Sequence, residues 1–376
     1  MKEFKKMKTA LIGSGMISGI YLENMKNRYK ILDLVGCSDI IPERSKKRAE
    51  EYGIKQMTNE EIFADPEIEM VVNTTYPVAH FEVAKAALEA GKSVYTEKMT
   101  TMTVDESTYL IDLAKKNGLF VGGAPDTFLS GAFQTARQII DSGILGKPVM
   151  VEACLSRSYH HERFYSGDEK RFAFCPHGGI IFDMGSYYMT ALVFLLGAVK
   201  RVCGFTQIRD PHRTYMNPDS PHYGEEMLVE SWNNTSGTLE FECGAIGNFT
   251  FTSESVGENT FKIFCTNGMI DLGDPNNYEH SVRIMNKKWE SSTITTAFGF
   301  RDANFRGLGV ADAAYAIRNG RAPRCSGELN RHVLEATLGI VESSETGKTY
   351  EMKTKCERPA PFESGYTENE ELVLAI

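Results

Sequence analysis

The stretch TALIGSGMIS, residues 9–18, decides how the rest of the chain is interpreted. Residues 9–12 form a short run typical of a buried strand, and this run ends abruptly at Gly13, Ser14 and Gly15. Closely spaced glycines between a strand and a helix are typical of a nucleotide-binding turn, but two glycines also suit a simple turn at a strand end. The surrounding sequence has to separate the two interpretations.

The sequence that follows favours the nucleotide-binding turn. As far as about residue 124, short β-branched or apolar runs alternate with helix-period segments, the βαβ pattern of a parallel sheet covered on both faces. The predicted strands are residues 9–12, 32–37, 70–73, 93–96 and 119–123. Pro42 and Pro77 each stand at the start of a predicted helix. We therefore expect an α/β fold with a doubly wound, Rossmann-type parallel sheet.

In such a fold, each glycine of the turn has a distinct physical role. Gly13 permits the tight turn, Gly15 lets the backbone approach a pyrophosphate, and the next helix directs its N-terminal amides at the charge. Asp39 follows the second strand, where an acid accepts hydrogen bonds from ribose hydroxyls and repels a 2′-phosphate, so the predicted cofactor is NAD rather than NADP. Arg44 would reach such a phosphate only if its loop bent toward it. The predicted cofactor-binding residues are Gly13, Ser14, Gly15, Met16, Ile17, Asp39, Thr74, Thr75, Pro77, His80, Glu97 and Lys98.

The pattern changes after Asp126. A predicted helix at residues 130–142 leads to long alternating stretches that are typical of antiparallel strands. These stretches are residues 199–208, 227–234, 237–244, 247–255 and 259–267, and helices are predicted at 302–319 and 328–344. We expect two domains, an NAD-binding Rossmann domain at 1–125 and a substrate-binding and oligomerisation domain at 126–376.

Composition excludes several classes of protein. The 376 residues are 42% hydrophobic and 24% charged, typical of a globular chain long enough for two domains. The net charge of -9 gives no reason to expect nucleic acid or an anionic membrane as a partner. No apolar run is long enough for a membrane span, and glycines interrupt the apolar start, so we expect no signal peptide and a cytoplasmic location. The eight cysteines stand singly without metal-ligand spacing, and no metal is predicted.

Two stretches carry side chains suited to proton transfer. In VYTEKM, residues 94–99, Glu97 and Lys98 follow a predicted strand and would face the nicotinamide, where a partly desolvated lysine exchanges its proton more readily. In HGGIIFDMGSYYMTALVFLLG, residues 177–197, one helix is expected to carry Asp183 and Tyr187 on the same face. Tyr187 would exchange a proton with a carbinol while Asp183 orients a sugar-like hydroxyl. The alternatives are an exposed lysine and an apolar helix whose tyrosines only pack.

A donor-rich stretch, SRSYHHERFY at residues 156–165, suits a polyhydroxylated or anionic substrate, although each residue alone is compatible with an ordinary surface position. The predicted substrate-binding residues are Asp126, Arg157, His160, His161, Arg163 and His177.

These stretches together resemble one family. The segments IGSG (12–15), NTTYPVAHFEVAKAALEAGKSVYTEKM (73–99), GGIIFDMGSYY (178–188) and residues 306–336 are similar to the Gfo/Idh/MocA oxidoreductases. The resemblance implies a C-terminal α/β domain with a large open, mostly antiparallel sheet that forms a homodimer or homotetramer. It also implies hydride transfer between NAD and a secondary hydroxyl of a sugar, glycoside or cyclitol, with Lys98 as the catalytic lysine of the family's E-K-P motif. Met99 replaces that proline, and Tyr187 stands where the motif G-G-x-x-x-D-x-G-x-H ends in histidine.

We therefore predict an NAD(P)-dependent dehydrogenase acting on CH–OH groups, with Lys98, Asp183 and Tyr187 as its catalytic residues. Residues 123–131 resemble the branch of the family that acts on sugars and glycosides, which adds the hypothesis of a 3-keto-glycoside product. Two alternatives stay open: an NAD-binding sensor or assembly protein without turnover, and a zinc-dependent hydrolase using His160, His161 and His177.

Overall fold

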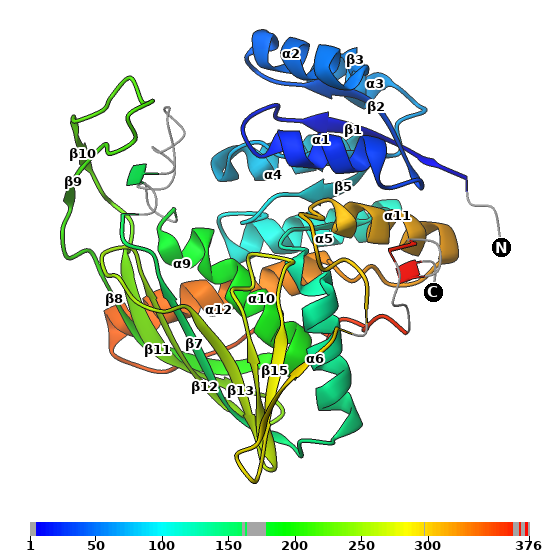
Figure 1. The fold of residues 1–376 in the computed structure, drawn as a ribbon. Helices are drawn as coiled ribbons and strands as arrows, with labels where there is room; N and C mark the ends of the chain where they lie inside the picture. The colour runs from blue at the N-terminus through cyan, green and yellow to red at the C-terminus, as the bar shows by residue number, and fades with distance from the viewer. Residues whose placement is uncertain are drawn as a thin grey trace. The chain divides into compact units, whose positions relative to one another are not determined.

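The computed structural model describes residues 5–159, 162–163, 178–296, 298–363, 368–369 and 373–374 (Figure 1). Contacts group the chain into two compact units. The first comprises residues 1–134, 297–331 and 359–376, and the second comprises 135–296 and 332–358. The domain boundary placed between residues 125 and 126 stays a prediction, and two later segments group with the first unit.

The first unit is built on a six-stranded sheet in the order β3-β2-β1-β4-β5-β6, with every neighbouring pair parallel. Its strands are β1 (Met7–Ile12), β2 (Leu32–Ser38), β3 (Lys55–Gln56), β4 (Met70–Asn73), β5 (Ser93–Thr96) and β6 (Val121–Gly123). This arrangement confirms the predicted Rossmann-type sheet. β3 was not predicted, because two exposed residues carry no periodic signal.

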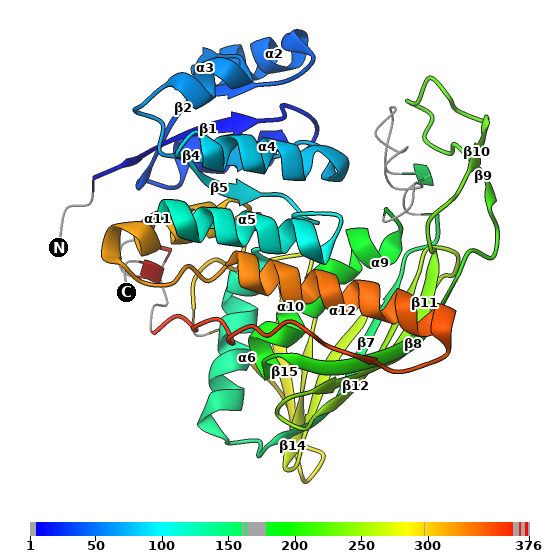
Figure 2. The same ribbon diagram turned by 180° about the vertical axis from the view of Figure 1, so that it is seen from behind.

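The helices of the first unit differ in whether the sequence carries a start signal for them. They are α1 (Ser18–Asn27), α2 (Pro42–Tyr52), α3 (Asn59–Ala64), α4 (Pro77–Glu89), α5 (Val104–Asn117) and α11 (Leu308–Asn319), with a 3-10 turn, η1, at Thr127–Leu129. Pro42 and Pro77 open α2 and α4, as predicted, and Thr58 and Thr103 form capping boxes at α3 and α5. Figure 2 shows α4 and α5 side by side along the sheet.

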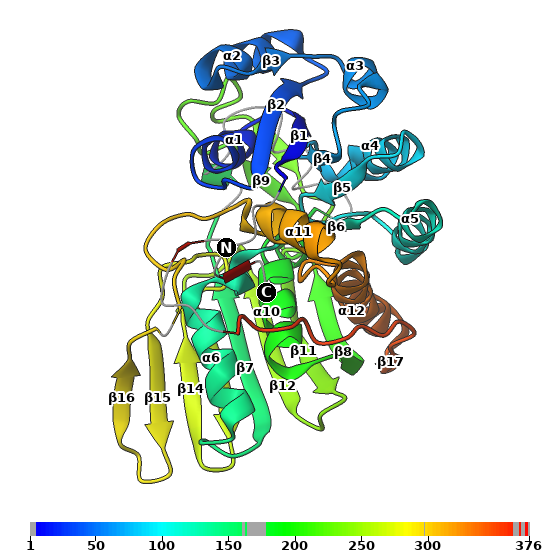
Figure 3. The same ribbon diagram turned by 90° about the vertical axis from the view of Figure 1, so that its right-hand side faces the viewer.

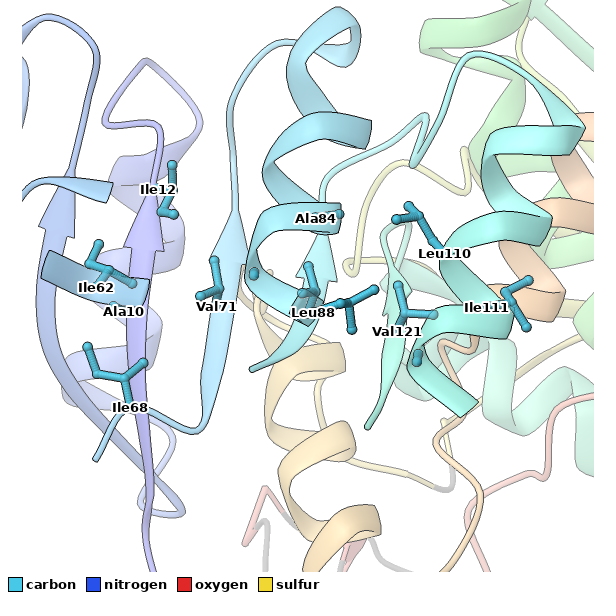
Figure 4. Close-up of a cluster of buried hydrophobic side chains, with 13 residues drawn as sticks. Ala10, Ile12, Ile62, Ile68, Val71, Ala84, Leu88, Leu110, Ile111 and Val121 are labelled. Atoms are coloured by element: carbon cyan, nitrogen blue, oxygen red, sulfur yellow. The ribbon is translucent and has the colours of Figure 1, made fainter. Parts of the chain in front are cut away.

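An apolar core fixes these helices to the sheet (Figure 4). It joins side chains from the strands to apolar side chains of α3, α4 and α5. Its members are Ala10, Ile12, Ile62, Ile68, Val71, Ala84, Ala87, Leu88, Val94, Leu110, Ile111, Ala114 and Val121. Because buried strands of a parallel sheet are apolar on both faces, their polar residues begin where the strands end. The carboxyl ends of β1, β2, β4 and β5 are therefore the places to look for a site.

The second unit is built on a nine-stranded sheet in the order β16-β15-β14-β13-β7-β12-β11-β8-β17 (Figure 3). Its strands are β7 (Pro148–Ser156), β8 (Val199–Gln207), β11 (Asn234–Phe241), β12 (Ile246–Thr252), β13 (Thr260–Cys265), β14 (Gly268–Leu272), β15 (Val282–Asn286), β16 (Ser291–Ile294) and β17 (Tyr350–Glu351). Only the β7–β12 pair is parallel among the pairs of these strands, which confirms a mixed, mostly antiparallel sheet. Burial alternates along β12, so one face of the sheet is packed and the other is exposed.

In the part of the chain that the structure describes, the remaining elements are two small strands and four helices. β9 (His212–Thr214) and β10 (Glu226–Leu228) form a separate antiparallel pair. The helices are α6 (Gly131–Ser142), α9 (Ile180–Asp183), α10 (Gly185–Leu196) and α12 (Gly327–Thr346). Every residue of α10 is buried, which explains why its sequence is apolar on all sides.

Three predicted elements differ from the structure. The strand expected at 227–234 is divided between β10, which pairs with β9, and β11, which pairs with β12 and β8 in the nine-stranded sheet. The helix expected from 302 begins at Leu308. The single helix expected to carry Asp183 and Tyr187 is interrupted at Met184, where Tyr187 N donates to the Met184 carbonyl over 3.2 Å.

Candidate functional site

The glycine turn after β1 requires a glycine at one position and leaves open space at the other. Gly13 has a φ of 100°, and a Cβ there would lie 2.6 Å from the carbonyl carbon of Thr74. At Gly15 a Cβ would meet no atom within 4 Å among the described residues. Gly13 therefore makes the close packing of β1 against β4 possible, while Gly15 keeps a space beside the start of α1 unobstructed.

The start of α1 suits a negatively charged group. Ile17 is its N-cap residue, and among the described residues no side chain caps the helix there. Ser18 Oγ instead donates to the Gly15 carbonyl over 2.6 Å, which braces the turn. Uncapped N-terminal amides attract an anion through their N–H groups and through the helix dipole. Together with the open space at Gly15, this end of α1 fits a pyrophosphate.

Asp39 is held beside the same turn. Its Oδ2 accepts a hydrogen bond from Ser14 N at 2.6 Å, and its Oδ1 accepts one from Ile41 N at 2.8 Å. A carboxylate offers about four acceptor positions, so two backbone contacts leave capacity for ribose hydroxyls. The predicted cofactor residues Ser14 and Asp39, from the ends of two neighbouring strands, are therefore brought together in the structure.

The end of β4 forms the next part of the site. Thr74 Oγ1 donates to the Gly13 carbonyl over 2.6 Å, so this threonine is bonded directly to the glycine turn. Thr75 Oγ1 donates to Asn73 Oδ1 over 2.7 Å, and Pro77 then opens α4. Met16, which follows Gly15 in the glycine turn, is 49% exposed, so its apolar side chain is available to contact a bound cofactor. Asn73, which the sequence analysis did not single out, organises this strand end.

Glu97 and Lys98 follow β5. Glu97 is 7% exposed, and its Oε1 accepts a hydrogen bond from the hydroxyl of Tyr21 on α1 at 2.6 Å. Glu97 Oε2 accepts from Lys98 N at 3.1 Å, and the Lys98–Met99 peptide bond is cis. Lys98 is half-buried. The lysine is thus placed at the carboxyl end of the sheet by a carboxylate that is itself bonded to α1, the helix of the glycine turn.

Asp126 has a structural task in the first unit. The residue is 1% exposed, and its Oδ2 accepts hydrogen bonds from Gly307 N and Gly309 N, at 2.9 and 3.0 Å, at the start of α11. It therefore satisfies backbone donors that a helix start leaves without partners in the helix. Its contact with substrate stays a prediction.

In the second unit Asp183 and Tyr187 stand on either side of the Met184 turn and are 5% and 6% exposed. The neighbouring Tyr188 is a core residue, because its ring meets that of Phe251 edge-on at 5.3 Å and burial raises the pKa of its hydroxyl. Of the two adjacent tyrosines, Tyr187 is the one that the sequence motif singles out, and its exposure of 6% compares with 0% for Tyr188.

The donor-rich stretch is only partly described. The Arg157 guanidinium forms an ion pair with Asp274 and lies 4.0 Å from Met184 Sδ, next to the turn that separates Asp183 from Tyr187. Asp274 was missed by the sequence analysis, because nothing in its local pattern marks it. Arg163 is exposed and lies over the Tyr159 ring at 5.6 Å. His160, His161 and His177 lie outside the described residues.

The described residues also bear on metal binding and on membrane insertion. Among the described residues, no three histidine, cysteine, aspartate or glutamate side chains are grouped so that they could hold a metal ion. No helix in the described part of the chain is both long and apolar enough to cross a membrane.

Two segments of the chain match models of known protein families. Residues 7–123 match a family model described as an oxidoreductase family with an NAD-binding Rossmann fold, and residues 133–271 match the GFO/IDH/MocA C-terminal domain. An inositol 2-dehydrogenase of Salmonella paratyphi B is 31% identical over 250 residues, covering 64% of this chain and 71% of that protein.

Two other relatives add to this comparison. An uncharacterised oxidoreductase of Schizosaccharomyces pombe is 33% identical over 196 residues, covering 51% of this chain, so the chain spans about half, 52%, of that relative's length. The solved structure of a levoglucosan dehydrogenase in complex with NADH has a TM-score of 0.79 at 19% identity, and the alignment covers 93% of this chain and 100% of that one. At this identity the likeness shows a shared fold.

Proposed function

Because this chain belongs to the Gfo/Idh/MocA family of oxidoreductases and carries its NAD-binding Rossmann domain, we propose that it is an NAD-dependent dehydrogenase of ring polyols. The family membership confirms the resemblance seen in the sequence. The substrate would be a sugar, glycoside or cyclitol, as the names of the inositol 2-dehydrogenase and levoglucosan dehydrogenase relatives suggest. When bound, NAD supplies an acceptor for the hydride at C4 of its nicotinamide ring.

The observation that carries the proposal is the placement of Lys98. Tyr21 of α1 bonds to Glu97, and Glu97 holds the backbone N–H of Lys98 at the carboxyl end of β5. In a doubly wound sheet this edge is where a dinucleotide and its substrate bind. Lys98 accepts the hydroxyl proton of the substrate as the hydride leaves its carbon, and returns it in the reverse direction.

The second unit supplies the other proposed groups. Tyr187 shares the transfer of the hydroxyl proton with Lys98, and Asp183 orients a neighbouring hydroxyl of the substrate. Their low exposure of 6% and 5% supports this role, because a polar group shielded from water fixes a substrate group more firmly. Arg157, His160, His161, Arg163 and His177 are proposed to contact the remaining hydroxyls.

We also propose a reaction product and an oligomer contact for this protein. Oxidation at the sugar C3 would give a 3-keto-glycoside. The exposed face of the nine-stranded sheet, which carries Ile246 on β12 and Phe205 on β8 at 49% and 79% exposure, would form the contact of a homodimer or homotetramer.

The test is a turnover screen with NAD against free sugars, inositols and glycosides, in which the absorbance of the reduced cofactor measures turnover. An added electron acceptor detects turnover if the coenzyme is never released. Lys98→Ala is expected to lower kcat by about 10²- to 10⁴-fold, the range for loss of a general acid–base group. Lys116→Ala, an exposed lysine at the end of α5, is the matched control and should leave kcat unchanged.

Calorimetric titration with NAD separates the alternatives. Tight NAD binding without turnover of any polyol would favour an NAD-binding sensor, and stoichiometric zinc without NAD-linked turnover would favour a hydrolase. Wild-type kcat in Lys98→Ala would refute the proposed role of this lysine.

A further inference from the structure

His80 is a fully buried histidine between two strand ends of the first unit. It lies on α4, one turn after Pro77, and is 0% exposed. Its Nδ1 is 2.7 Å from the carbonyl oxygen of Met99, and its Nε2 is 3.0 Å from that of Thr75. The ring therefore connects the residue that follows Lys98 with the strand end beside the glycine turn.

The two contacts cannot both be hydrogen bonds of a neutral imidazole. A neutral ring carries one N–H, and both of its neighbours are carbonyl oxygens, which only accept. Burial lowers the pKa of His80, so the neutral ring predominates near pH 7. The charged groups that act on it are Glu97, which favours the protonated ring, and Lys98, which disfavours it. One carbonyl then accepts a hydrogen bond from the single ring N–H, and the shorter contact is the one to Met99.

The contact to Met99 adds a second restraint on the backbone around Lys98. Glu97 Oε2 accepts a hydrogen bond from the Lys98 N–H at 3.1 Å, on one side of the lysine. His80 meets the carbonyl of the next residue, Met99, on the other side. Because the peptide group before Lys98 and the carbonyl of the residue after it are both held, the direction in which the Lys98 side chain leaves the backbone is restricted.

We infer that His80 is a positioning residue for Lys98, with its proton on Nδ1 and donated to the Met99 carbonyl. This inference rests on the proposed function, in which Lys98 moves the hydroxyl proton. It separates the role of His80 from the cofactor contact predicted from the sequence: loss of the Nδ1 donor displaces the lysine and lowers the rate of the proton-transfer step, while NAD is still bound.

Two substitutions separate the ring nitrogens. His80→Asn keeps an N–H donor at the position of Nδ1, because the asparagine Nδ2, like the histidine Nδ1, is attached to Cγ. His80→Gln keeps a donor near the position of Nε2 only. We expect His80→Asn to stay within about threefold of wild-type kcat, and His80→Gln to lose about 10- to 100-fold, as small displacements of a catalytic group do. KM for the polyol and the NAD affinity measured by calorimetry should stay within about twofold in both variants.

A matched control distinguishes positioning from general stability. His332 is also 0% exposed, but its Nε2 accepts a hydrogen bond from Val199 N at 2.9 Å and its Nδ1 contacts Thr354 Oγ1 at 3.0 Å, within the second unit. His332→Asn should lower the melting temperature without lowering kcat of the folded enzyme. Wild-type kcat in His80→Gln, or equal losses in His80→Asn and His80→Gln, would overturn the inference.

One measurement does not depend on turnover. The nitrogen NMR spectrum of the wild-type protein, with the His80 signals assigned by their loss in His80→Asn, is expected to show a protonated Nδ1 and an unprotonated Nε2. The opposite tautomer overturns the inference even if no substrate is found. A wild-type protein that oxidises no polyol refutes the proposed function instead, so the two failures are distinguishable.

Discussion

The hydroxyl of Tyr21 donates a hydrogen bond to Glu97 Oε1 over 2.6 Å, which joins the helix after the glycine turn to the residue before Lys98. The carboxylate is almost fully buried, and its other oxygen receives the Lys98 N–H. A buried carboxylate needs such donors, because leaving one oxygen without a partner incurs a desolvation cost. The bond therefore couples the geometry of the glycine turn to that of Lys98, the proposed catalytic lysine.

Tyr21→Phe tests this coupling. Removing the hydroxyl leaves Glu97 Oε1 without this donor, and the expected loss of stability is about 1.5–3 kcal/mol, the range for hydrogen bonds to charged groups. Urea denaturation measures it. Tyr109→Phe, a half-exposed tyrosine on α5, is the control and should change stability by less than about 0.5 kcal/mol. Equal stabilities of the two variants would contradict the role of the Tyr21 hydroxyl.

The two glycines of the turn should respond differently to alanine. Gly13→Ala places a Cβ 2.6 Å from the Thr74 backbone at a φ of 100°, so we expect a large loss of stability in thermal denaturation. Gly15→Ala meets no described atom within 4 Å and should keep its stability while losing NAD affinity, by about tenfold for each 1.4 kcal/mol of lost contact. Unchanged NAD affinity in a folded Gly15→Ala protein would place the pyrophosphate elsewhere.

The sheet of the first unit could be predicted because its signals are local. A strand, a glycine turn and a proline at a helix start are each read from a few consecutive residues, and Lys98 follows from the end of its strand. The partner of Glu97 could not be predicted in this way. Tyr21 lies 76 residues away in the chain, and neither residue carries a local signal that links them.

Two other features show the same limit. The bond from Gly307 N, 181 residues beyond Asp126 at the start of α11, could not be predicted from the sequence around Asp126, whose substrate contact stays a prediction. Gly185, next to the interruption at Met184, likewise lies against a distant residue, because a Cβ there would come within 3.2 Å of the Phe251 ring of β12. Both contacts join distant segments, and periodicity within one segment does not report them.

Asp126→Ala tests the structural task of this residue. Without the carboxylate, Gly307 N and Gly309 N lose their acceptor, and we expect a loss of about 1–2 kcal/mol, as for other helix caps. KM for the polyol should not change in the folded fraction. A raised KM at wild-type stability would instead support the substrate contact predicted from the sequence. Asp105→Ala, at the exposed first turn of α5, serves as the control for charge alone.

Glu335 on α12 should make stability depend on pH. Burial alone would raise the pKa of its carboxyl, but hydrogen bonds from Thr354 N, Lys353 N and the Tyr350 hydroxyl outweigh this effect and lower it. A carboxyl with a lowered pKa in the folded state stabilises it fully above its unfolded value of about 4.5. That contribution is lost as pH falls through the lowered folded pKa.

The measurement is the free energy of unfolding between pH 7 and pH 3. The wild-type protein should lose more stability over this range than Glu335→Gln, whose amide does not titrate. Glu342→Gln, an exposed residue of the same helix, should follow the wild-type curve. Parallel curves for wild type and Glu335→Gln would show that this carboxyl does not contribute to the acid dependence.

Asp39→Asn tests the coenzyme preference. The carboxylate accepts hydrogen bonds from Ser14 N and Ile41 N at 2.6 and 2.8 Å, and an amide oxygen can retain only one of these two contacts. The substitution removes the negative charge that would repel a 2′-phosphate, and it weakens the acceptor for the ribose hydroxyls. We expect the ratio of kcat/KM for NAD to that for NADP to fall by about 10- to 100-fold, corresponding to about 1.4–2.7 kcal/mol. Glu43→Gln, an acid in the first turn of α2, controls for nearby charge and should leave the ratio unchanged. If Asp39→Asn retained the wild-type ratio, the preference would have to come from other residues of the turn.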